Sequence, residues 1–455
     1  MTTTIFSGQS AAIEHPEELL LVFKSAEKPR EAWRIGTEHE KIGFNLQTGQ
    51  PLPYEGERGI RQLLEQIAKR FDWAPVWEGN NPIALLRGQA SITLEPGGQL
   101  ELSGAPLQNT HETCKELHQH LFEVRSISEE FGIGWFGFGR NPSIPSEKMP
   151  WMPKERYQIM RRYLPTRGKM ALDMMLGTAT VQTNLDYENE ADMARKFRVA
   201  LTFAPVITAM FANSPLVAGQ PTGYLSTRAH VWAHTDPDRC GIPQFVFRED
   251  FSYQDYVNYA LDVPMFFIHR EGHYLEYAGR SFREFVERGM DGHVATQEDW
   301  VLHLTTIFPE VRVKNIIELR MADVGPAPFI CALAALSRGL LYDNTALNDA
   351  DALARKFPVE ARNGLRDTIL KEGLQAQVGH QPMKAWAHDL LDIAASGLKR
   401  LQAKDQNGDD EVKYLLPLRQ VVETGVTQAE VLLETWQDDW AKDLARLIGS
   451  DWQIA

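Results

Sequence analysis

The sequence is poor in cysteine and has no signal for export. Its 455 residues include three cysteines, Cys114, Cys240 and Cys331, an odd and sparse set that excludes the disulfide framework of a small secreted domain. Residues 1–7 lack the basic and apolar regions of a secretory signal. Both absences favour a reducing compartment, and we therefore expect a cytoplasmic protein.

The sequence also lacks an excess of positive charge and a long apolar run. Lysine and arginine number 47 against 61 aspartates and glutamates, a net charge of −14, which disfavours a nucleic-acid footprint or an anionic membrane surface. The most apolar run, residues 329–342, is too short to span a bilayer and contains Ser337 and Arg338. We expect a buried helix there, with neither nucleic acid nor membrane as a partner.

Several motifs of catalysis and cofactor binding are missing. There is no Gly-x4-Gly-Lys-Ser/Thr loop for nucleotide phosphates and no Gly-x-Ser-x-Gly elbow for a nucleophilic serine. Residues 132–137 have the glycine spacing of a dinucleotide site, but a predicted helix precedes them and β-favouring aromatics follow, the reverse of the Rossmann order. His111, Cys114 and His118 share a helical face, but a structural zinc site needs a fourth ligand.

An acidic strand is the most informative feature that the sequence does contain. Residues 33–44 have the β-favouring pattern of a strand, and alternation places Glu38 and Glu40 on one face. Two buried carboxylates repel each other unless a cation or a proton lies between them. A divalent cation and an ordinary solvent-facing strand surface are both compatible with this stretch alone.

Three more β-patterned segments, residues 91–102, 178–186 and 314–320, also place carboxylates or amides on one face. Their spread along the chain argues against the three domains that its length suggests. In one antiparallel sheet they would form an oxygen-rich surface that suits magnesium or manganese rather than zinc. The candidate ligands are Glu38, Glu40, Glu95, Glu101, Gln182 and Glu318.

Cations accompany these carboxylates. Arg320 lies two residues beyond Glu318 on the same predicted face, where it would meet a phosphate that accompanies magnesium. Residues 154–169 hold six lysines and arginines, which predicts either an anion site or a solvated helix face. Arg228, His230, Trp232 and His234 follow a period of two, which predicts a shared face of an extended segment.

With these residues assembled, the chain resembles glutamate–cysteine ligase of the plant and proteobacterial type. The matching segments keep the order of that family. They are residues 34–41 (RIGTEHEK), 94–99 (LEPGGQ), 101–104 (ELSG), 152–154 (MPK) with Arg156 and Tyr157, 181–182 (VQ), 184–186 (NLD), 211–215 (FANSP) and 304–312 (LTTIFPEVR).

The resemblance implies an α+β fold like that of glutamine synthetase, in which a curved antiparallel sheet forms a funnel surrounded by helices. It implies one catalytic domain over residues 1–455, with a sheet core at about 30–325 and a mainly helical part at about 326–455. The implied reaction uses ATP to phosphorylate the γ-carboxylate of glutamate, which the amine of cysteine then attacks. The products are γ-glutamylcysteine, ADP and phosphate, in the first step of glutathione biosynthesis, by a monomer or a homodimer.

The resemblance also implies roles for individual residues. The six oxygen-bearing residues above would bind Mg²⁺, Arg320 would stabilise the transferring phosphoryl group, and Arg228 would bind the α-carboxylate of glutamate. Trp232 and Arg156 would lie near the amino-acid substrates. A ligase or guanidino kinase of the same fold with another substrate, and a non-catalytic nucleotide-binding regulator, remain as alternatives.

The cysteines match the plant pattern only in part. One of the two plant pairs is retained, Cys114 and Cys331, which predicts either a disulfide or two buried thiols. Residues 277–300, where the plant regulatory hairpin carries its cysteines, contain none. Redox switching in the plant manner is therefore not expected.

Overall fold

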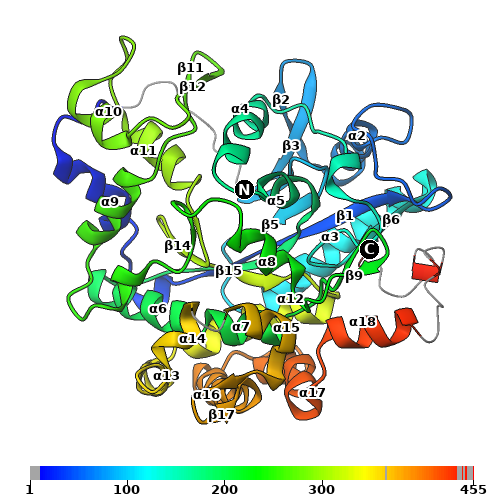
Figure 1. Cartoon of the computed structure of the whole chain (residues 1–455), viewed down its shortest axis with the longest axis vertical. Coiled ribbons are helices and arrows are strands. Elements are labelled where there is room, and N and C mark those ends of the chain that lie inside the picture. Colours follow the sequence, from blue (N-terminus) through cyan, green and yellow to red (C-terminus); the bar gives the residue numbers. More distant parts are fainter. Residues whose placement is uncertain (1–10, 364–365, 438–442, 444–445, 448–453, 455) are drawn as a thin grey trace.

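The large sheet of the protein brings together strands from distant parts of the sequence (Figure 1). The computed structural model describes residues 11–363, 366–437, 443, 446–447 and 454, so residues 1–7, which we expected to lack a signal, lie outside the described part. Among the described residues, nine strands form this sheet in the order β14-β15-β7-β1-β5-β4-β3-β2, with β6 also paired to β1. Their bounds are β1 Ile35–Asn45, β2 Ala74–Glu78, β3 Asn81–Arg87, β4 Ala90–Leu94, β5 Leu100–Ser103, β6 Ile133–Phe136, β7 Thr180–Leu185, β14 Val311–Val313 and β15 Ile317–Asp323.

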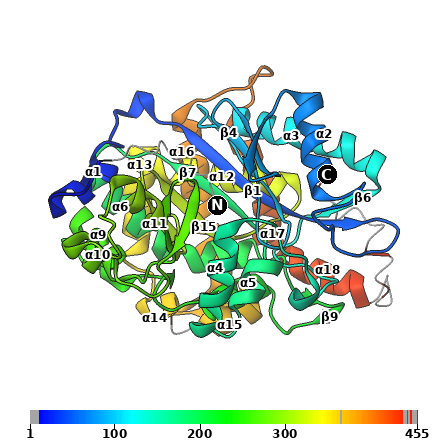
Figure 2. The same ribbon diagram turned by 90° about the horizontal axis from the view of Figure 1, so that it is seen from above.

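Strand β1 is the centre of the sheet and crosses the middle of the molecule (Figure 2). Its first half lies between β5 and β7, where Glu38 is opposite Gln182 and Glu40 is opposite Glu101. Its second half pairs with β6, and every pairing in the sheet is antiparallel. The predicted α+β fold, with the four polar segments in one antiparallel sheet, is confirmed.

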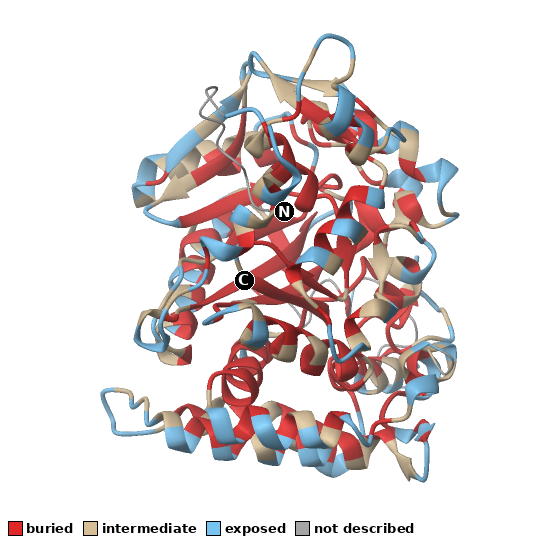
Figure 3. Ribbon diagram, turned by 90° about the vertical axis from the view of Figure 1, so that its left-hand side faces the viewer, coloured by how far each residue is buried: buried red, intermediate tan, exposed pale blue. Residues whose placement is uncertain are grey.

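Helices cover the face of the sheet opposite the carboxylates. Helix α12 (Ala327–Leu341) packs on β1 and β7, and α3 (Thr110–Phe131) packs on β1 and α12. Lys41, on the strand face opposite Glu40, is within 2.8 Å of His120 of α3, so odd-numbered β1 side chains point to these helices. Figure 3 shows the sheet as a buried layer, with exposed residues on the outer helices.

The other helices surround this core. They are α1 Leu21–Lys24, α2 Ile60–Phe71, α4 Glu155–Tyr163, α5 Ala171–Gly177, α6 Glu190–Thr202, α7 Ala204–Met210, α8 Thr227–Ala233, α9 Tyr253–Asp262, α10 Phe282–Arg288, α11 Gln297–Leu304, α13 Asn344–Ala354, α14 Val359–Asn363, α15 Arg366–Glu372, α16 Met383–Leu401, α17 Leu416–Thr424 and α18 Gln428–Gln437.

In the part of the chain that the structure describes, four short strand pairs lie outside the main sheet. They are β8 Leu216–Val217 with β9 Gln220–Pro221, β10 Cys240–Gly241 with β13 Phe308–Pro309, β11 Phe267–Arg270 with β12 His273–Glu276, and β16 Gln377–Val378 with β17 Gln381–Pro382. In the described residues, the last pair lies between η6 at Gly373–Gln375 and α16. The single catalytic domain stays a prediction.

The expected extended segment at Arg228 to His234 is wrong, because residues 227–233 form helix α8. The Ser226 side chain accepts a hydrogen bond from the backbone N–H of Ala229 and caps this helix. Arg228 and Trp232 are four residues apart, so they share a helix face just as they would share a strand face. The alternation alone could not separate the two structures.

The apolar run at residues 329–342 lies in and just after α12, and its hydrophobic side chains are buried in the core. This confirms the expected buried helix. Within the described ranges, none of the helices combines the length and the apolar character needed to cross a membrane.

Candidate active site

Glu38 and Glu40 lie on the face of β1 that points away from α3 and α12, and both are buried. Glu38 Oε1 accepts a hydrogen bond from Asn184 Nδ2 at 2.7 Å, whereas its Oε2 has no partner. Glu40 Oε2 accepts from the backbone N–H of Thr180 at 3.1 Å. Because these side chains are buried, the solvent-facing interpretation of this strand is excluded.

The burial of so many carboxylates disfavours their ionised forms. Burial, with the charges of Glu318 and Glu101, raises the pKa of Glu38 to about 7. Burial, with Glu95 and Glu101, raises the pKa of Glu40 well above its ordinary value. A cation among them would remove this penalty.

The turn after β4 sets the position of Glu95. Its backbone N–H donates to Gln99 O at 2.9 Å, and the N–H of Gly98 donates to Glu95 O at 2.9 Å. A Cβ on Gly97 would lie 2.3 Å from the backbone oxygen of Leu176, so only glycine fits there. Across the turn, Glu101 on β5 accepts from Thr93 Oγ1 at 2.7 Å.

Cations surround Glu318 on β15. Its carboxylate accepts from Arg312 Nε at 2.6 Å and Nη2 at 3.0 Å, and from Arg320 Nη1 at 3.1 Å, and Lys314 Nζ lies 3.6 Å away. Although burial opposes ionisation, these three cations hold the pKa of Glu318 well below its ordinary value. Sequence reasoning assigned no role to Arg312, which lies opposite Glu318 in the β14–β15 register.

Arg320, which contacts Glu318, also lies next to Arg228. Arg320 Nη1 donates to Gln182 Oε1 at 2.7 Å, and Arg228 Nη2 donates to the backbone oxygen of Arg320 at 2.8 Å. Trp232, one turn after Arg228, has its ring centroid 5.7 Å from the Arg228 guanidinium carbon and 5.9 Å from that of Arg320. Arg228, Trp232 and Arg320 therefore lie together in the structure, while their substrate roles stay predictions.

Asp323 fixes the segment that carries Arg228, and sequence reasoning missed it. Its Oδ2 accepts from Ser214 Oγ at 2.7 Å, and its Oδ1 accepts from Ser226 Oγ at 2.9 Å. Ser214 Oγ also accepts from the backbone N–H of Arg228 at 3.0 Å. Ser214 lies in residues 211–215, one of the segments that carry the family resemblance, and that segment was the signal from which this interaction could have been sought.

We name the side of the sheet that carries Glu38, Glu40, Glu101 and Glu318 the acidic face. Two pockets open onto it. Glu40, Glu95, Gln182, Arg228, Trp232 and Arg320 line the first, which we name the arginine pocket. Glu38, Asn184 and Lys314 line the second, the lysine pocket, together with the apolar Leu21, Val301 and Leu304. Glu38 and Glu40 are neighbours on one face of β1, so the two pockets border adjacent positions of this strand.

The cations of residues 154–169 divide into two groups. Lys154 and Arg156 are buried, and Lys154 Nζ donates to Leu94 O at 2.8 Å, which holds the end of β4. Arg162 and Arg167 form partly exposed ion pairs with Glu276 and Asp238. Arg156 is not part of the lining of either pocket, so its substrate role stays a prediction.

Metal-binding geometry is not assembled in this arrangement. In the part of the chain that the structure describes, no three His, Cys, Asp or Glu side chains lie close enough together to hold a metal ion. The zinc candidate fails because Cys114 is bonded to Cys331 and His118 Nδ1 contacts the backbone oxygen of Cys114 at 2.6 Å. The disulfide joins α3 to α12, whereas Cys240 is a free thiol.

The known proteins that this chain is similar to are glutamate–cysteine ligases. The model of glutamate–cysteine ligase family 2 matches residues 34–450. The chain is 46% identical to the chloroplastic glutamate–cysteine ligases of Brassica juncea and Nicotiana tabacum, over 94% of this chain and 82% and 81% of theirs. A crystal structure of glutamate–cysteine ligase from Francisella tularensis in complex with AMP has a TM-score of 0.56 at 11% identity, covering 92% of this chain and 89% of that one, and supports the fold alone.

The cytoplasmic expectation is contradicted by these relatives, which are named as chloroplastic enzymes. It rested on a low cysteine content and on the character of residues 1–7. Few cysteines are compatible with several compartments, and the Cys114–Cys331 disulfide shows that the thiols are not all reduced. Cysteine content therefore could not decide the location.

Proposed function

The chain belongs to glutamate–cysteine ligase family 2, and we propose that its ligase reaction takes place on the acidic face of β1, between the two pockets. The protein is an ATP-dependent ligase that forms γ-glutamylcysteine from glutamate and cysteine, in glutathione biosynthesis. The observation that carries the placement is one buried acidic face that two pockets reach, with Arg320 and Arg228 at one of them. Its partners are small molecules, and assembly as a monomer or homodimer stays a prediction.

A magnesium or manganese ion fits the donors of this face by their chemistry. The ligand atoms that Glu38, Glu40, Glu95, Glu101 and Gln182 offer are all oxygens, and Glu38 Oε2 is a buried carboxyl oxygen without a hydrogen-bond partner. Glu318 would join them only by giving up contacts with Arg312 or Arg320. When bound, the ion neutralises charge on the phosphates of ATP.

The arginine pocket is suited to the amino-acid substrates. The Arg228 guanidinium binds the α-carboxylate of glutamate, and Asp323 with Ser214 orients the helix that carries it. The Trp232 ring forms an adjoining wall. This arrangement directs the γ-carboxylate of glutamate towards Arg320 and the acidic face.

The lysine pocket is suited to the nucleotide. Lys314 offers a cation for phosphate beside Glu38, and Leu21, Val301 and Leu304 offer an apolar wall for a base. ATP and glutamate then approach the acidic face from different sides. This separation places the terminal phosphate next to the γ-carboxylate.

The reaction divides into two balanced steps. A γ-carboxylate oxygen of glutamate bonds to the terminal phosphorus of ATP, and the bond from that phosphorus to the ADP oxygen breaks. Arg320, beside Gln182 and Glu318, stabilises the charge on the transferring phosphoryl group. The cysteine nitrogen then bonds to the acyl carbon, phosphate leaves with the carbon–oxygen bond electrons, and the nitrogen loses a proton.

The decisive experiment measures ADP release by the purified protein with magnesium-ATP and glutamate, with and without cysteine, and determines the product mass. Release that requires both amino acids and yields γ-glutamylcysteine is expected. Release with glutamate and a different amine would keep the site but change the substrate. No release under any condition would favour the regulator alternative.

A further inference from the structure

The lysine pocket contains a buried hydroxyl group that the roles proposed above leave unused. Ser103 of β5 lines this pocket and is buried, and among the described residues its Oγ has no hydrogen-bond partner. A buried hydroxyl without a partner costs free energy. Ser103 Oγ is therefore expected to bond to an ordered water or to a ligand in the pocket.

The strand register places a second hydroxyl beside the first. Ser91 of β4 lies directly opposite Ser103, and so does Glu38 of β1 on the other side of β5. Directly opposed residues point to the same face of a sheet, so these three side chains form a row across the floor of the lysine pocket. The Cβ atoms of such a pair are about 4.5–5.5 Å apart, a spacing at which the two serines can bond to adjacent hydroxyls of one ligand.

The position of Lys314 indicates which part of a nucleotide reaches this row. Lys314 directly follows β14, whereas Ser103 and Ser91 lie on the other side of β1 in the order β14-β15-β7-β1-β5-β4. With the phosphates of ATP between Lys314 and Glu38, the sugar extends over β5 and β4. We propose that Ser103 and Ser91 bind the 2′- and 3′-hydroxyls of the ATP ribose, an inference that rests on the proposed placement of the nucleotide in the lysine pocket.

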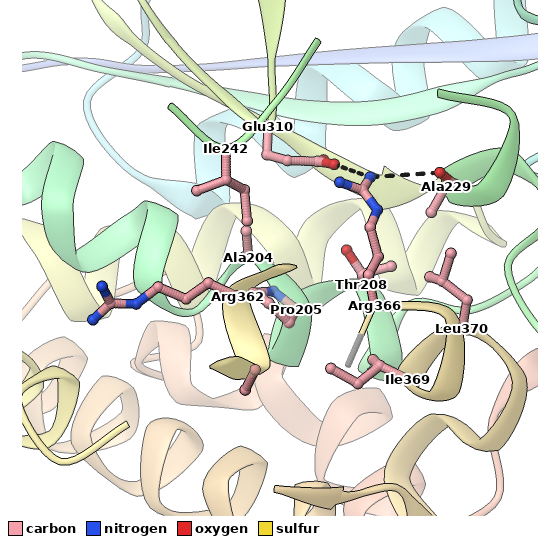
Figure 4. Close-up of a pocket in the computed structure, with 11 residues that line it drawn as sticks. Ala204, Pro205, Thr208, Ala229, Ile242, Glu310, Arg362, Arg366, Ile369 and Leu370 are labelled. Atoms are coloured by element: carbon pink, nitrogen blue, oxygen red, sulfur yellow. Dashed lines mark hydrogen bonds and ion pairs between the residues drawn. The ribbon is translucent and has the colours of Figure 1, made fainter. Parts of the chain in front are cut away.

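The pocket between α7, α14 and α15 does not offer this chemistry (Figure 4). Much of its lining is apolar, and the hydroxyl of Thr208 there already donates to the backbone oxygen of Met321 at 3.3 Å. Arg366 is paired with Glu310. A hydroxyl that already has a partner gains less from a ligand than one that has none, so Ser103 is the better site for a sugar.

This arrangement would make the pocket selective for ribonucleotides. A nucleotide that lacks one ribose hydroxyl would leave one of the two serine hydroxyls unpaired in a buried site. Sites that hydrogen-bond a substrate hydroxyl reject the analogue without it for this reason. The two serines are therefore residues that determine specificity, and they take no part in the chemical steps.

Binding of magnesium-ADP, 2′-deoxy-ADP and 3′-deoxy-ADP to the full chain is measured by isothermal titration calorimetry. Glutamate and cysteine are left out, so ligase activity is not needed. Both analogues should bind about tenfold more weakly than ADP, because each leaves one serine hydroxyl unpaired.

Two serine variants then assign the hydroxyls. Ser103→Ala should weaken ADP about tenfold and remove the disadvantage of one analogue, and Ser91→Ala should do the same for the other analogue. Ser126→Ala is the matched control and should keep the disadvantage of both, because Ser126 is exposed on α3 and donates to Phe122 O of its own helix. Thermal melting checks that each variant folds.

Three results would overturn the proposal. The first is equal affinity of the unmodified protein for the three nucleotides, which would mean that water satisfies Ser103. The second is discrimination against the analogues that survives when both serines are replaced by alanine. The third is a Ser103→Ala protein that binds all three nucleotides equally less well than the unmodified protein relative to each starting affinity, which would show an effect on β5 and none on the sugar.

Lys314→Met separates this inference from the placement of the nucleotide. It should weaken all three nucleotides by a similar factor, because it removes a phosphate contact and no sugar contact. Unchanged binding in Lys314→Met would show that the nucleotide lies elsewhere. Weaker binding in Lys314→Met, with serine variants that behave like the unmodified protein, would keep the placement and overturn the sugar contacts alone.

Discussion

Glu38 Oε2 is a buried oxygen without a hydrogen-bond partner, and the neighbouring carboxylates repel its negative charge. It is buried near Glu101 and Glu318, and the raised pKa of Glu38 means that its charge is tolerated less well in the folded chain than in the unfolded one. The ionised side chain therefore destabilises the metal-free fold. The proposed metal site uses the ionised carboxylate of Glu38, whereas the stability of the metal-free protein favours the neutral form.

Glu38→Gln should stabilise the metal-free protein at alkaline pH while abolishing turnover. Because the folded pKa is about 7 against an ordinary 4.5, the unmodified protein loses stability as pH rises from about 4.5 to 7, by up to about 3 kcal/mol. The variant lacks this loss. Urea denaturation of both proteins at pH 5 and pH 8, in the presence of a chelator, measures the difference in their free energies of unfolding. An equal difference at the two pH values would contradict the raised pKa of Glu38.

Arg228→Lys should mainly weaken glutamate binding. An ammonium group cannot both bond to the backbone oxygen of Arg320 and bind a carboxylate bidentately, so we expect a glutamate KM at least tenfold higher. Arg125→Lys, on the exposed side of α3, is the control. Steady-state kinetics against glutamate decide, and an unchanged KM would move the carboxylate site elsewhere.

Among the elements, those with a local signal were predictable. Asn109 Oδ1 accepts a hydrogen bond from the backbone N–H of Glu112 and caps α3, and the local sequence Pro-Gly-Gly forms the turn between β4 and β5. Helix α8 was not predictable, because residues four apart share a face in a helix and in a strand. Near the start of the described chain, a 3-10 turn at Pro16–Leu20 leads into the short helix α1.

Gly97→Ala should disable the turn that positions Glu95. The added methyl would lie 2.3 Å from the backbone oxygen of Leu176, so the turn must shift and carry Glu95 with it. We expect a loss of turnover of at least tenfold with a lower melting temperature. Gly36→Ala is the matched control, since its Cβ would meet only contacts of 3.5 Å or more. Equal behaviour of the two variants would argue against a role for the turn.

At the scale of the whole molecule, the sequence predicted which residues share the acidic face but not how their charges are paired. Arg312 neutralises Glu318, and Asp323 orders the segment of Arg228, because strand register and chain crossing bring them together. No local pattern encodes those distances. The pocket lined by α7, α14 and α15 was not predictable for the same reason, since these helices meet only in the folded chain.

The Cys114–Cys331 disulfide acts at this same scale, because it spans a sequence separation of 217 residues. Replacing both cysteines by serine should lower the free energy of unfolding by about 2–5 kcal/mol, since the unfolded chain gains freedom. Turnover should persist, because α3 and α12 lie across the sheet from the carboxylates. Urea denaturation measures the change, with Cys240→Ser as the control, and equal stabilities would show that the cross-link contributes nothing.

The strand order has a consequence for how the protein is made. Strands β1 to β5 leave the ribosome early, whereas β7 and β15, which complete the other side of β1, come from residues 180–185 and 317–323. During synthesis at about 5–20 residues per second, the edge of β1 that will receive β7 stays unpaired for several seconds or more. An open strand edge invites pairing with other chains, so nascent chains halted before Thr180 should be the species that depends most on chaperones.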